Sequence, residues 1–192
     1  MATDWRRRWL DRANHLASWS KDPSTKVGCV LVLDQHAVGE GYNGFPHGVK
    51  DEEDRLLARA SKLQWTIHAE ANAVAHAARY GHSTRGATAF LTHPPCCFCA
   101  TLLIQAGVVV VVIDTGPGID DYLGRWSQDC DVARAILTEA GVAVIDHPQP
   151  ENAPHAFVGS LVHPGCGVCH LPQDATIHLT EVPYVAPSPT SL

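Results

Sequence analysis

Apolar positions along this chain switch between the spacing of helices and the spacing of strands. From residue 5 to residue 18 the apolar side chains lie three or four positions apart, which predicts an amphipathic helix. Two short runs, 27–33 and 37–41, predict strands, and the polar pair Asp34-Gln35 between them predicts a hairpin. The first part of the chain is therefore expected to form one helix followed by two antiparallel strands.

The following residues alternate between predicted helices and predicted strands. The predicted helices cover 51–61, 66–78, 96–106 and 131–140, and the predicted strands cover 86–91, 108–113 and 142–145. The run 108–113 is apolar at every position, as expected of a parallel strand that is covered on both faces. Two strands followed by repeated helix and strand units predict an α/β protein with a three-layer α/β/α fold around a mixed five-stranded sheet.

The length of the chain limits the number of its domains. Its 192 residues, 45% of them hydrophobic and 18% charged, are enough for one good core. We expect one domain over residues 1–146. Residues 147–192 hold eight of the thirteen prolines, five of the twelve histidines and no lysine or arginine, so we expect them to form an extended, loosely packed appendage.

The charge of the chain argues against a nucleic-acid partner. The formal net charge is −6, and no lysine or arginine follows Arg134. Since a protein that binds a polynucleotide usually presents a basic face, polynucleotide binding is disfavoured. The densest basic cluster consists of Arg6, Arg7, Arg8 and Arg12. We interpret this cluster as a solvated helix face, with a local nucleic-acid patch as the alternative.

The sequence also carries signals about cellular location. The N-terminal segment is polar and rich in arginine and lacks the apolar stretch of a signal peptide. The apolar run 108–113 is too short to span a bilayer. Seven cysteines, an odd number with several at metal-ligand spacing, fit a reducing compartment better than a disulfide framework. These features predict a cytoplasmic protein that does not bind a membrane.

Two short segments contain the side chains of a catalytic zinc site, His68-Ala69-Glu70 and Pro95-Cys96-Cys97-Phe98-Cys99. The imidazole of His68 and the thiolates of Cys96 and Cys99 would fill three tetrahedral positions of Zn²⁺ and leave the fourth for water. Zinc lowers the pKa of such a water to about 7, so hydroxide is available at neutral pH. Glu70 is not needed as a ligand and can carry protons from this water to the substrate.

The order H-x-E followed by P-C-x-x-C is the signature of zinc-dependent deaminases. Each half alone is ambiguous, because C-x-x-C also occurs as a redox pair or as half of a structural zinc site. Cys97 offers an alternative thiol to Cys96. Its spacing to Cys99 does not suit one helical face, so we interpret Cys97 as a small buried apolar residue.

Several segments resemble the deoxycytidylate (dCMP) deaminase family of the cytidine deaminase-like superfamily. They are D-P-S-T-K-V-G at 22–28, G-Y-N-G-F-P at 41–46, H-A-E-A-N-A at 68–73, P-C-C-F-C at 95–99 and Q-A-G at 105–107. The resemblance extends over roughly residues 5–146. The zinc motifs are shared by the whole superfamily, whereas the segment 41–46 discriminates in favour of the dCMP deaminases.

The resemblance implies a zinc-dependent hydrolase that converts dCMP to dUMP and ammonia in pyrimidine nucleotide metabolism. By resemblance, Asn43 binds the sugar 3′-hydroxyl, the backbone near Ala69 meets the base, and Glu70 shuttles protons beside the zinc. Lys26 and an N-terminal arginine are the candidates for the 5′-phosphate. The alternatives are that Asn43 is a turn residue with left-handed backbone geometry and that Lys26 is an ordinary solvent-facing lysine.

The resemblance also implies regulation and assembly. Many members of the family respond to dCTP and dTTP and form hexamers, so these effectors and a homo-oligomer are expected. The residues His93, Cys97 and Phe98 make the edge of the site more apolar and richer in thiols than is usual in the family. Another small substrate, such as a modified cytosine nucleotide, a nucleoside or a free base, is therefore an alternative. A non-catalytic zinc module is disfavoured, because it has no need of Glu70.

The predicted appendage contains a second group of metal-ligating side chains. His163, Cys166, Cys169 and His170 lie within eight residues of one another. One interpretation is a structural zinc knuckle, which would give the chain a second zinc ion besides the catalytic one. The other is a disordered tail with incidental ligands, because the adjacent Cys169 and His170 are hard to place on one tetrahedral ion.

Overall fold

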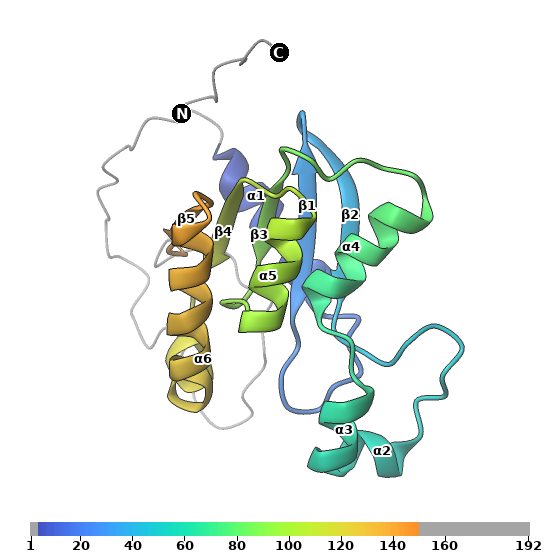
Figure 1. Ribbon diagram of the computed structural model, residues 1–192. Helices are drawn as coiled ribbons and strands as arrows, with labels where there is room; N and C mark the ends of the chain where they lie inside the picture. The colour runs from blue at the N-terminus through green and yellow to red at the C-terminus, as the bar shows by residue number, and fades with distance from the viewer. Residues whose placement is uncertain (1–3, 150–192) are drawn as a thin grey trace, which may run out of the picture. The chain divides into compact units, whose positions relative to one another are not determined.

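A mixed five-stranded sheet runs through the computed structural model, which describes residues 4–149 (Figure 1). Its strands are β1 (Gly28–Leu33), β2 (His36–Tyr42), β3 (Thr88–Leu91), β4 (Val110–Asp114) and β5 (Ala143–His147). Their order is β2-β1-β3-β4-β5. The pairs β1–β2 and β1–β3 are antiparallel, and the pairs β3–β4 and β4–β5 are parallel. The predicted mixed five-stranded sheet is thus confirmed.

Helices cover both faces of this sheet (Figure 1). They are α1 (Trp5–Ala17) on one face, and α4 (Ala69–Arg79), α5 (Cys97–Gln105) and α6 (Ile119–Glu139) on the other. The alternation of side chains along β1 sends Val30 and Val32 toward α1 and Cys29 and Leu31 toward the opposite core. Strand β4 likewise contributes to both cores, so the predicted three-layer α/β/α fold is confirmed.

The hairpin between β1 and β2 turns at the predicted pair. Asp34 and Gln35 have φ of 49° and 63°, the positive values that a two-residue type I′ turn requires. Such a turn matches the right-handed twist of the flanking strands. The register then places Leu33 opposite His36.

Helix α6 is twice as long as the sequence pattern predicted. The prediction placed a helix at 131–140, but α6 begins at Ile119 after Gly118, whose φ is 88°. The missed half contains Gly124, which weakens the helical signal, together with several charged residues. An apolar series nevertheless runs through the whole helix, at Ile119, Leu123, Trp126, Cys130, Ala133 and Leu137.

The segment between β2 and α4 also differs from the prediction. A single helix was expected at 51–61, but two short helices form, α2 (Glu53–Leu57) and α3 (Arg59–Trp65), with Ala58 extended between them at ψ 105°. Neither helix has a buried residue, so no core packing holds them in one continuous helix.

The expected helix 66–78 begins three residues late, at Ala69. Ile67 instead forms an antiparallel bridge with Gly44, with N···O distances of 2.8 and 3.1 Å. This bridge keeps the chain extended as far as His68, which becomes the N-cap of α4.

A buried charge cluster fixes α1 against the end of β4. Asp114 is 3% exposed and accepts hydrogen bonds from Arg7 Nη1 and Nη2 at 3.2 and 2.8 Å and from Asn14 Nδ2 at 2.7 Å. Burial alone would raise the pKa of Asp114, but these bonds lower it overall. Arg7, one of the N-terminal arginines considered above, therefore has a structural partner.

Two further predictions concern membrane insertion and the C-terminal extension. Within residues 4–149, no helix combines the length and the apolar character needed to cross a bilayer. Apart from its first three residues, the predicted extension 147–192 lies outside the described residues, and so do the candidate ligands His163, Cys166, Cys169 and His170.

Candidate active site

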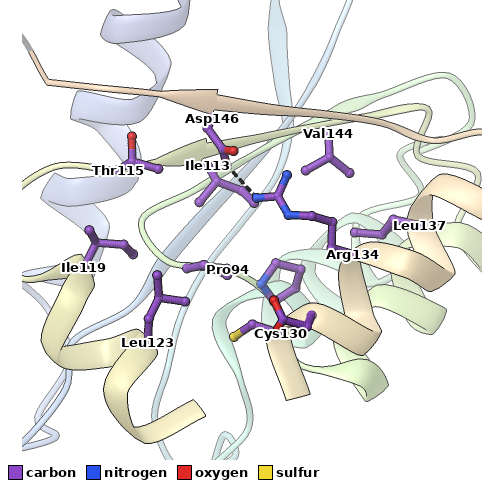
Figure 2. A pocket seen from close by; sticks show the side chains of 12 residues that line it. Pro94, Ile113, Thr115, Ile119, Leu123, Cys130, Arg134, Leu137, Val144 and Asp146 are labelled. Atoms are coloured by element: carbon purple, nitrogen blue, oxygen red, sulfur yellow. Dashed lines mark hydrogen bonds and ion pairs between the residues drawn. The ribbon is translucent and has the colours of Figure 1, made fainter. Parts of the chain in front are cut away.

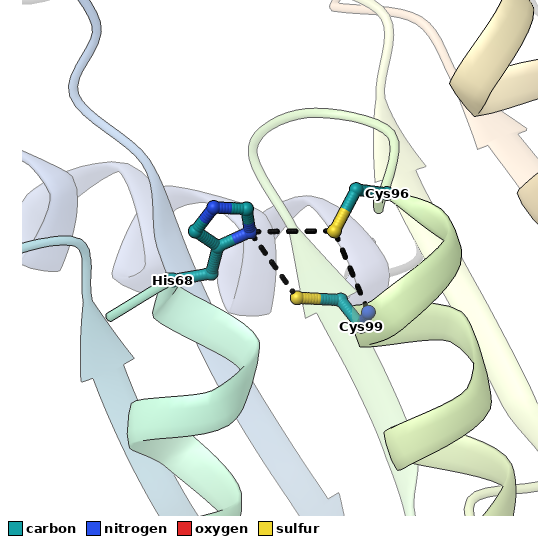
Figure 3. Close-up of side chains that lie close together, drawn as sticks. All are labelled: His68, Cys96 and Cys99. Atoms are coloured by element: carbon teal, nitrogen blue, oxygen red, sulfur yellow. Dashed lines mark hydrogen bonds between the residues drawn. The ribbon is translucent and has the colours of Figure 1, made fainter. Parts of the chain in front are cut away.

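The three predicted zinc ligands come together where two helices begin (Figure 3). His68 is the N-cap of α4 and Cys96 is the N-cap of α5, both with extended backbone at ψ 156° and 169°. The Nδ1 atom of His68 lies 3.4 Å from the Sγ of Cys96 and 3.4 Å from the Sγ of Cys99. All three donor atoms are within 4.8 Å of one another.

This geometry fits a zinc ion. With the usual Zn–N and Zn–S bond lengths, a nitrogen and a sulfur on one tetrahedral ion lie roughly 3.6 Å apart. The two N···S distances of 3.4 Å are close to that value. One imidazole and two thiols are also a donor set that zinc prefers. Three protein ligands in the described part of the chain correspond to a catalytic site, which keeps one position open.

The environment favours a thiolate at Cys96. Its hydrogen bond with Cys99 is the main cause that lowers the pKa of Cys96 to about 4, and the contact with His68 adds to it. The same Cys96–Cys99 bond, together with burial, raises the pKa of Cys99. The backbone N–H of Cys99 also donates to Cys96 Sγ at 3.5 Å, at the helix end where the dipole favours negative charge.

Glu70 lies buried in the first turn of α4, two residues after His68. It is 3% exposed and is not part of the three-donor cluster. Burial is the main influence on its carboxyl group and raises the pKa above its usual value. Burial disfavours the ionised form, so this carboxyl group takes up a proton more readily than a solvated one, which suits general acid/base catalysis.

Two glycines of β2 determine how closely α4 approaches the sheet. A Cβ atom on Gly41 would lie 2.3 Å from the carbonyl oxygen of Ala69 and 2.5 Å from the backbone nitrogen of Ala73. A Cβ on Gly39 would lie 2.5 Å from the Ala73 oxygen. Since His68 and Glu70 are attached to α4, these glycines set the position of both side chains.

We expect Gly41→Ala to displace α4, because the clashing atoms are backbone atoms that cannot rotate away. Overpacking of this kind costs about 1–3 kcal/mol of the free energy of unfolding. Thermal unfolding and zinc titration should show a lower melting temperature and weaker zinc binding. Gly44→Ala is the matched control for stability, because its nearest atom, Tyr42 Cε2, is 3.9 Å away. Equal stability of the two variants would contradict the role of Gly41.

The predicted substrate-binding residues occupy different environments. Asn43 is 6% exposed; its Oδ1 accepts from the Val27 N–H at 2.8 Å and its Nδ2 donates to the Thr25 carbonyl at 2.9 Å. Its φ is not positive, which removes the left-handed turn as an explanation. Lys26 is exposed, with Nζ 3.5 Å from the Ser18 carbonyl oxygen. Ala69 is fully buried at the start of α4.

Helix α6 contributes residues to the site that the motifs did not indicate. The carboxylate of Asp129 accepts from the Cys97 N–H at 3.3 Å, and the Cys97 thiol donates to the Asp129 carbonyl at 3.4 Å. Cys97 packs against the core but is only half-buried, so its interpretation as a buried apolar residue is wrong. Asp129 was missed because it lies in the unpredicted half of α6.

A second pair of side chains connects α6 to the segment before the zinc cysteines. The rings of His93 and Tyr122 have centroids 4.6 Å apart, and the Tyr122 hydroxyl donates to the Pro94 carbonyl at 3.2 Å. Burial lowers the pKa of His93 to about 4, so this imidazole is neutral at physiological pH. His93 and Tyr122 therefore form an aromatic, uncharged pair at the segment that leads to Cys96.

A cavity of about 170 Å³ lies between α6 and the strands β4 and β5 (Figure 2). Its lining is mainly apolar and includes the ion pair between Arg134 and Asp146, whose N···O distance is 2.7 Å. None of the three clustered donors lines it. We therefore do not assign it to the reaction.

A cluster of three zinc-type donors with a buried carboxylate beside it, on an α/β/α sheet, defines the class of zinc-dependent hydrolytic deaminases. Comparison with protein families agrees, because the model for the cytidine and deoxycytidylate deaminase zinc-binding region matches residues 3–115. The chain belongs to this cytidine and deoxycytidylate deaminase family.

Individual relatives match most of the domain. An uncharacterized deaminase in the luxG 3′ region of Aliivibrio fischeri is 38% identical over 144 residues, which cover 75% of this chain and 94% of the relative. The deoxycytidylate deaminase of Mus musculus is 32% identical over 148 residues, covering 72% and 77%. The crystal structure of the dCMP deaminase from the cyanophage S-TIM5 in complex with dCMP and dUMP has a TM-score of 0.60 and 26% identity, covering 77% and 99%.

Proposed function

We propose that this protein deaminates a cytosine deoxynucleotide, converting dCMP and water to dUMP and ammonia. The observation that carries the proposal is the buried Glu70 beside the cluster of His68, Cys96 and Cys99. Support for the substrate comes from relatives named deoxycytidylate deaminases and from the phage enzyme, whose structure contains dCMP and dUMP.

The proposed chemistry divides between the metal ligands and Glu70. His68, Cys96 and Cys99 would hold a zinc ion, which when bound makes hydroxide available at neutral pH. Glu70 accepts one proton of the attacking water and delivers it to N3 of the cytosine ring while the water oxygen bonds to C4. It then moves the second proton of that oxygen to the amino group at C4, so that the C4–N bond breaks, ammonia leaves and the C4 carbonyl of dUMP forms. The raised pKa of Glu70 suits a group that must hold this proton between the two transfers.

The proposed substrate contacts follow from the positions of Asn43 and Ala69. The Asn43 side chain uses one amide hydrogen and one lone pair on the backbone of Thr25 and Val27. One hydrogen and one lone pair remain, which is enough to bind a sugar 3′-hydroxyl. The backbone at Ala69, between His68 and Glu70, is assigned to the base. Both assignments stay predictions, and Lys26 is the candidate for the phosphate that the sequence alone suggests.

We expect a free nucleotide to be a far better substrate than a base inside a strand. A 3′-hydroxyl that binds Asn43 is esterified in a polynucleotide, and loss of this hydrogen bond costs about 1–3 kcal/mol, or ten- to hundredfold in kcat/KM. Ammonia release should be compared for dCMP, 3′-blocked dCMP and single-stranded DNA.

The two control substrates separate two claims. Single-stranded DNA processed as efficiently as dCMP would refute the free-nucleotide proposal. If 3′-blocked dCMP reacts as well as dCMP, only the role of Asn43 is removed. The acidic net charge of −6 adds to the expected discrimination against polynucleotides.

A second candidate is a modified cytosine nucleotide. It is favoured by the character of the site edge, where the neutral His93 packs on Tyr122 and Phe98 is 67% exposed beside Cys99. The assay should therefore include 5-methyl-dCMP and 5-hydroxymethyl-dCMP together with deoxycytidine and cytosine. The substrate with the highest kcat/KM identifies the natural class.

Several finer expectations stay proposals. They are the place in pyrimidine nucleotide metabolism, the effectors dCTP and dTTP, a homo-oligomer, the cytoplasmic location and the division into residues 1–146 and 147–192. A structural zinc bound by His163, Cys166, Cys169 and His170 is also a proposal, because these side chains lie outside the described residues.

A further inference from the structure

One face of α6 lies along the active site. Tyr122, Arg125 and Asp129 are three and four residues apart, so they share one side of the helix. Tyr122 packs on His93, and Asp129 bonds the first residue of the zinc helix α5. Arg125 is about 6 Å along the helix axis from Asp129. Arg125 therefore lies one helical turn from Asp129, which contacts Cys97 between the two zinc-ligand cysteines.

Arg125 has hydrogen-bond partners but no counter-ion in the described part of the chain. Its Nη2 donates to the Thr25 hydroxyl at 3.3 Å and its Nε donates to the Asp121 carbonyl at 3.2 Å. Within residues 4–149 it forms no ion pair. Its charge nevertheless reaches the site, since it contributes to the lowered pKa of His93. An exposed arginine held without a carboxylate is available to an anionic ligand.

The loop that meets Arg125 has a fixed conformation. The Asp22 carboxylate accepts from the backbone N–H groups of Ser24 and Thr25 at 2.7 and 3.1 Å. Lys62 closes the loop from α3, with Nζ 2.9 Å from Asp22 Oδ1 and 3.1 Å from Ser24 Oγ. The loop therefore brings four groups close together, namely the hydroxyls of Ser24 and Thr25, the Lys62 ammonium that pairs with Asp22, and the unpaired Arg125 guanidinium.

The same loop contacts Asn43, the proposed ligand of the sugar. The Thr25 carbonyl accepts from Asn43 Nδ2 at 2.9 Å, while the Thr25 hydroxyl faces Arg125. A single residue thus links the proposed 3′-hydroxyl site to the guanidinium group. In a nucleotide the 3′-hydroxyl and the 5′-phosphate belong to the same sugar, so adjacent sites for the two groups are what a nucleotide requires.

We propose that Arg125, together with the hydroxyls of Thr25 and Ser24, binds the 5′-phosphate of the substrate, and that Lys26 does not. This inference rests on the proposed function. The guanidinium fork matches two phosphate oxygens, whereas Lys62 is already neutralised by Asp22. Lys26 extends toward the Ser18 carbonyl at the end of α1, not toward Arg125 or Asn43.

The test compares kcat/KM for dCMP with kcat/KM for deoxycytidine, which lacks the phosphate. Arg125→Gln is expected to reduce the ratio of the two values 10- to 100-fold, the range for loss of a charge-assisted hydrogen bond. Arg125→Lys should retain part of the ratio, and Thr25→Val should reduce it less than Arg125→Gln. Arg134→Gln is the matched control, because it removes the same charge from the same helix and Arg134 pairs with Asp146.

The outcomes distinguish this inference from the proposed function. A wild-type enzyme that processes deoxycytidine as well as dCMP would overturn the nucleotide substrate, and the inference with it. A wild-type preference for dCMP that survives in Arg125→Gln, or that is lost in Lys26→Gln instead, would overturn the inference alone. Circular dichroism and thermal unfolding verify that each variant is folded. If Arg125→Gln does not fold, the ratio of kcat/KM values measured for Thr25→Val tests the inference independently.

Discussion

Replacing Glu70 by glutamine is expected to lower kcat at least 10²- to 10⁴-fold, roughly the contribution of a general acid/base group. The loss should lie at the upper end, because one carboxyl group serves several proton transfers in the proposed reaction. The amide has nearly the same shape but cannot accept and release a proton. Steady-state ammonia release with the best cytosine nucleotide measures the effect.

The same variant is expected to keep its fold and its zinc. Glu70 is not among the clustered metal donors, so zinc content should equal that of the wild type. Burial raises the pKa of Glu70, which means that the charged form is disfavoured in the fold, so a neutral amide should not lower the melting temperature. Glu139→Gln, at an exposed position of α6, is the control. A Glu70→Gln enzyme with near wild-type kcat would refute the assignment.

The fold was largely predictable because its sheet follows local patterns. The apolar run around β4 and the two-residue turn at Asp34-Gln35 each carry a signal that does not depend on distant residues. The first half of α6 was not predictable in the same way. Gly124 and its charged neighbours obscure the apolar series, and the packing of Ile119 and Leu123 becomes visible only in the structure.

Site residues in local motifs were likewise predictable, whereas site residues that depend on distant contacts were not. His68, Glu70, Cys96 and Cys99 lie in two short motifs, so their types and spacing could be read directly from the sequence. Arg125, by contrast, meets Thr25 across 100 positions of the chain, and no motif connects them.

Side chains that depend on tertiary contacts were misread or missed. Cys97 was interpreted as an apolar residue because its hydrogen-bond partner Asp129 lies 32 positions away in the sequence. The glycines of β2 are in the printed sequence, but the close approach of α4 that requires Gly39 and Gly41 depends on the packing of helix against sheet. Local sequence therefore specified the reacting groups, whereas the residues that position them became visible only through the fold.

Replacing Cys99 by alanine is expected to remove one equivalent of zinc per chain and with it all measurable deamination. Structural zinc sites contribute about 10–16 kcal/mol in total, so the loss of one thiolate should weaken binding by about 3 kcal/mol or more, over 100-fold. Zinc should be measured against the wild-type chain after dialysis with a chelator, so that only the difference between variants is interpreted.

Cys97→Ala is the matched control, because it deletes the same atom two residues away. Cys97 Sγ contacts the Asp129 carbonyl, whereas Cys99 Sγ lies 3.4 Å from His68 Nδ1. The Cys97 N–H keeps its bond to the Asp129 carboxylate in this variant, so zinc content should stay at the wild-type value. Zinc lost from Cys97→Ala and retained in Cys99→Ala would mean that the adjacent thiol is the ligand. In that case α5 would have to present Cys97 to His68 in place of Cys99.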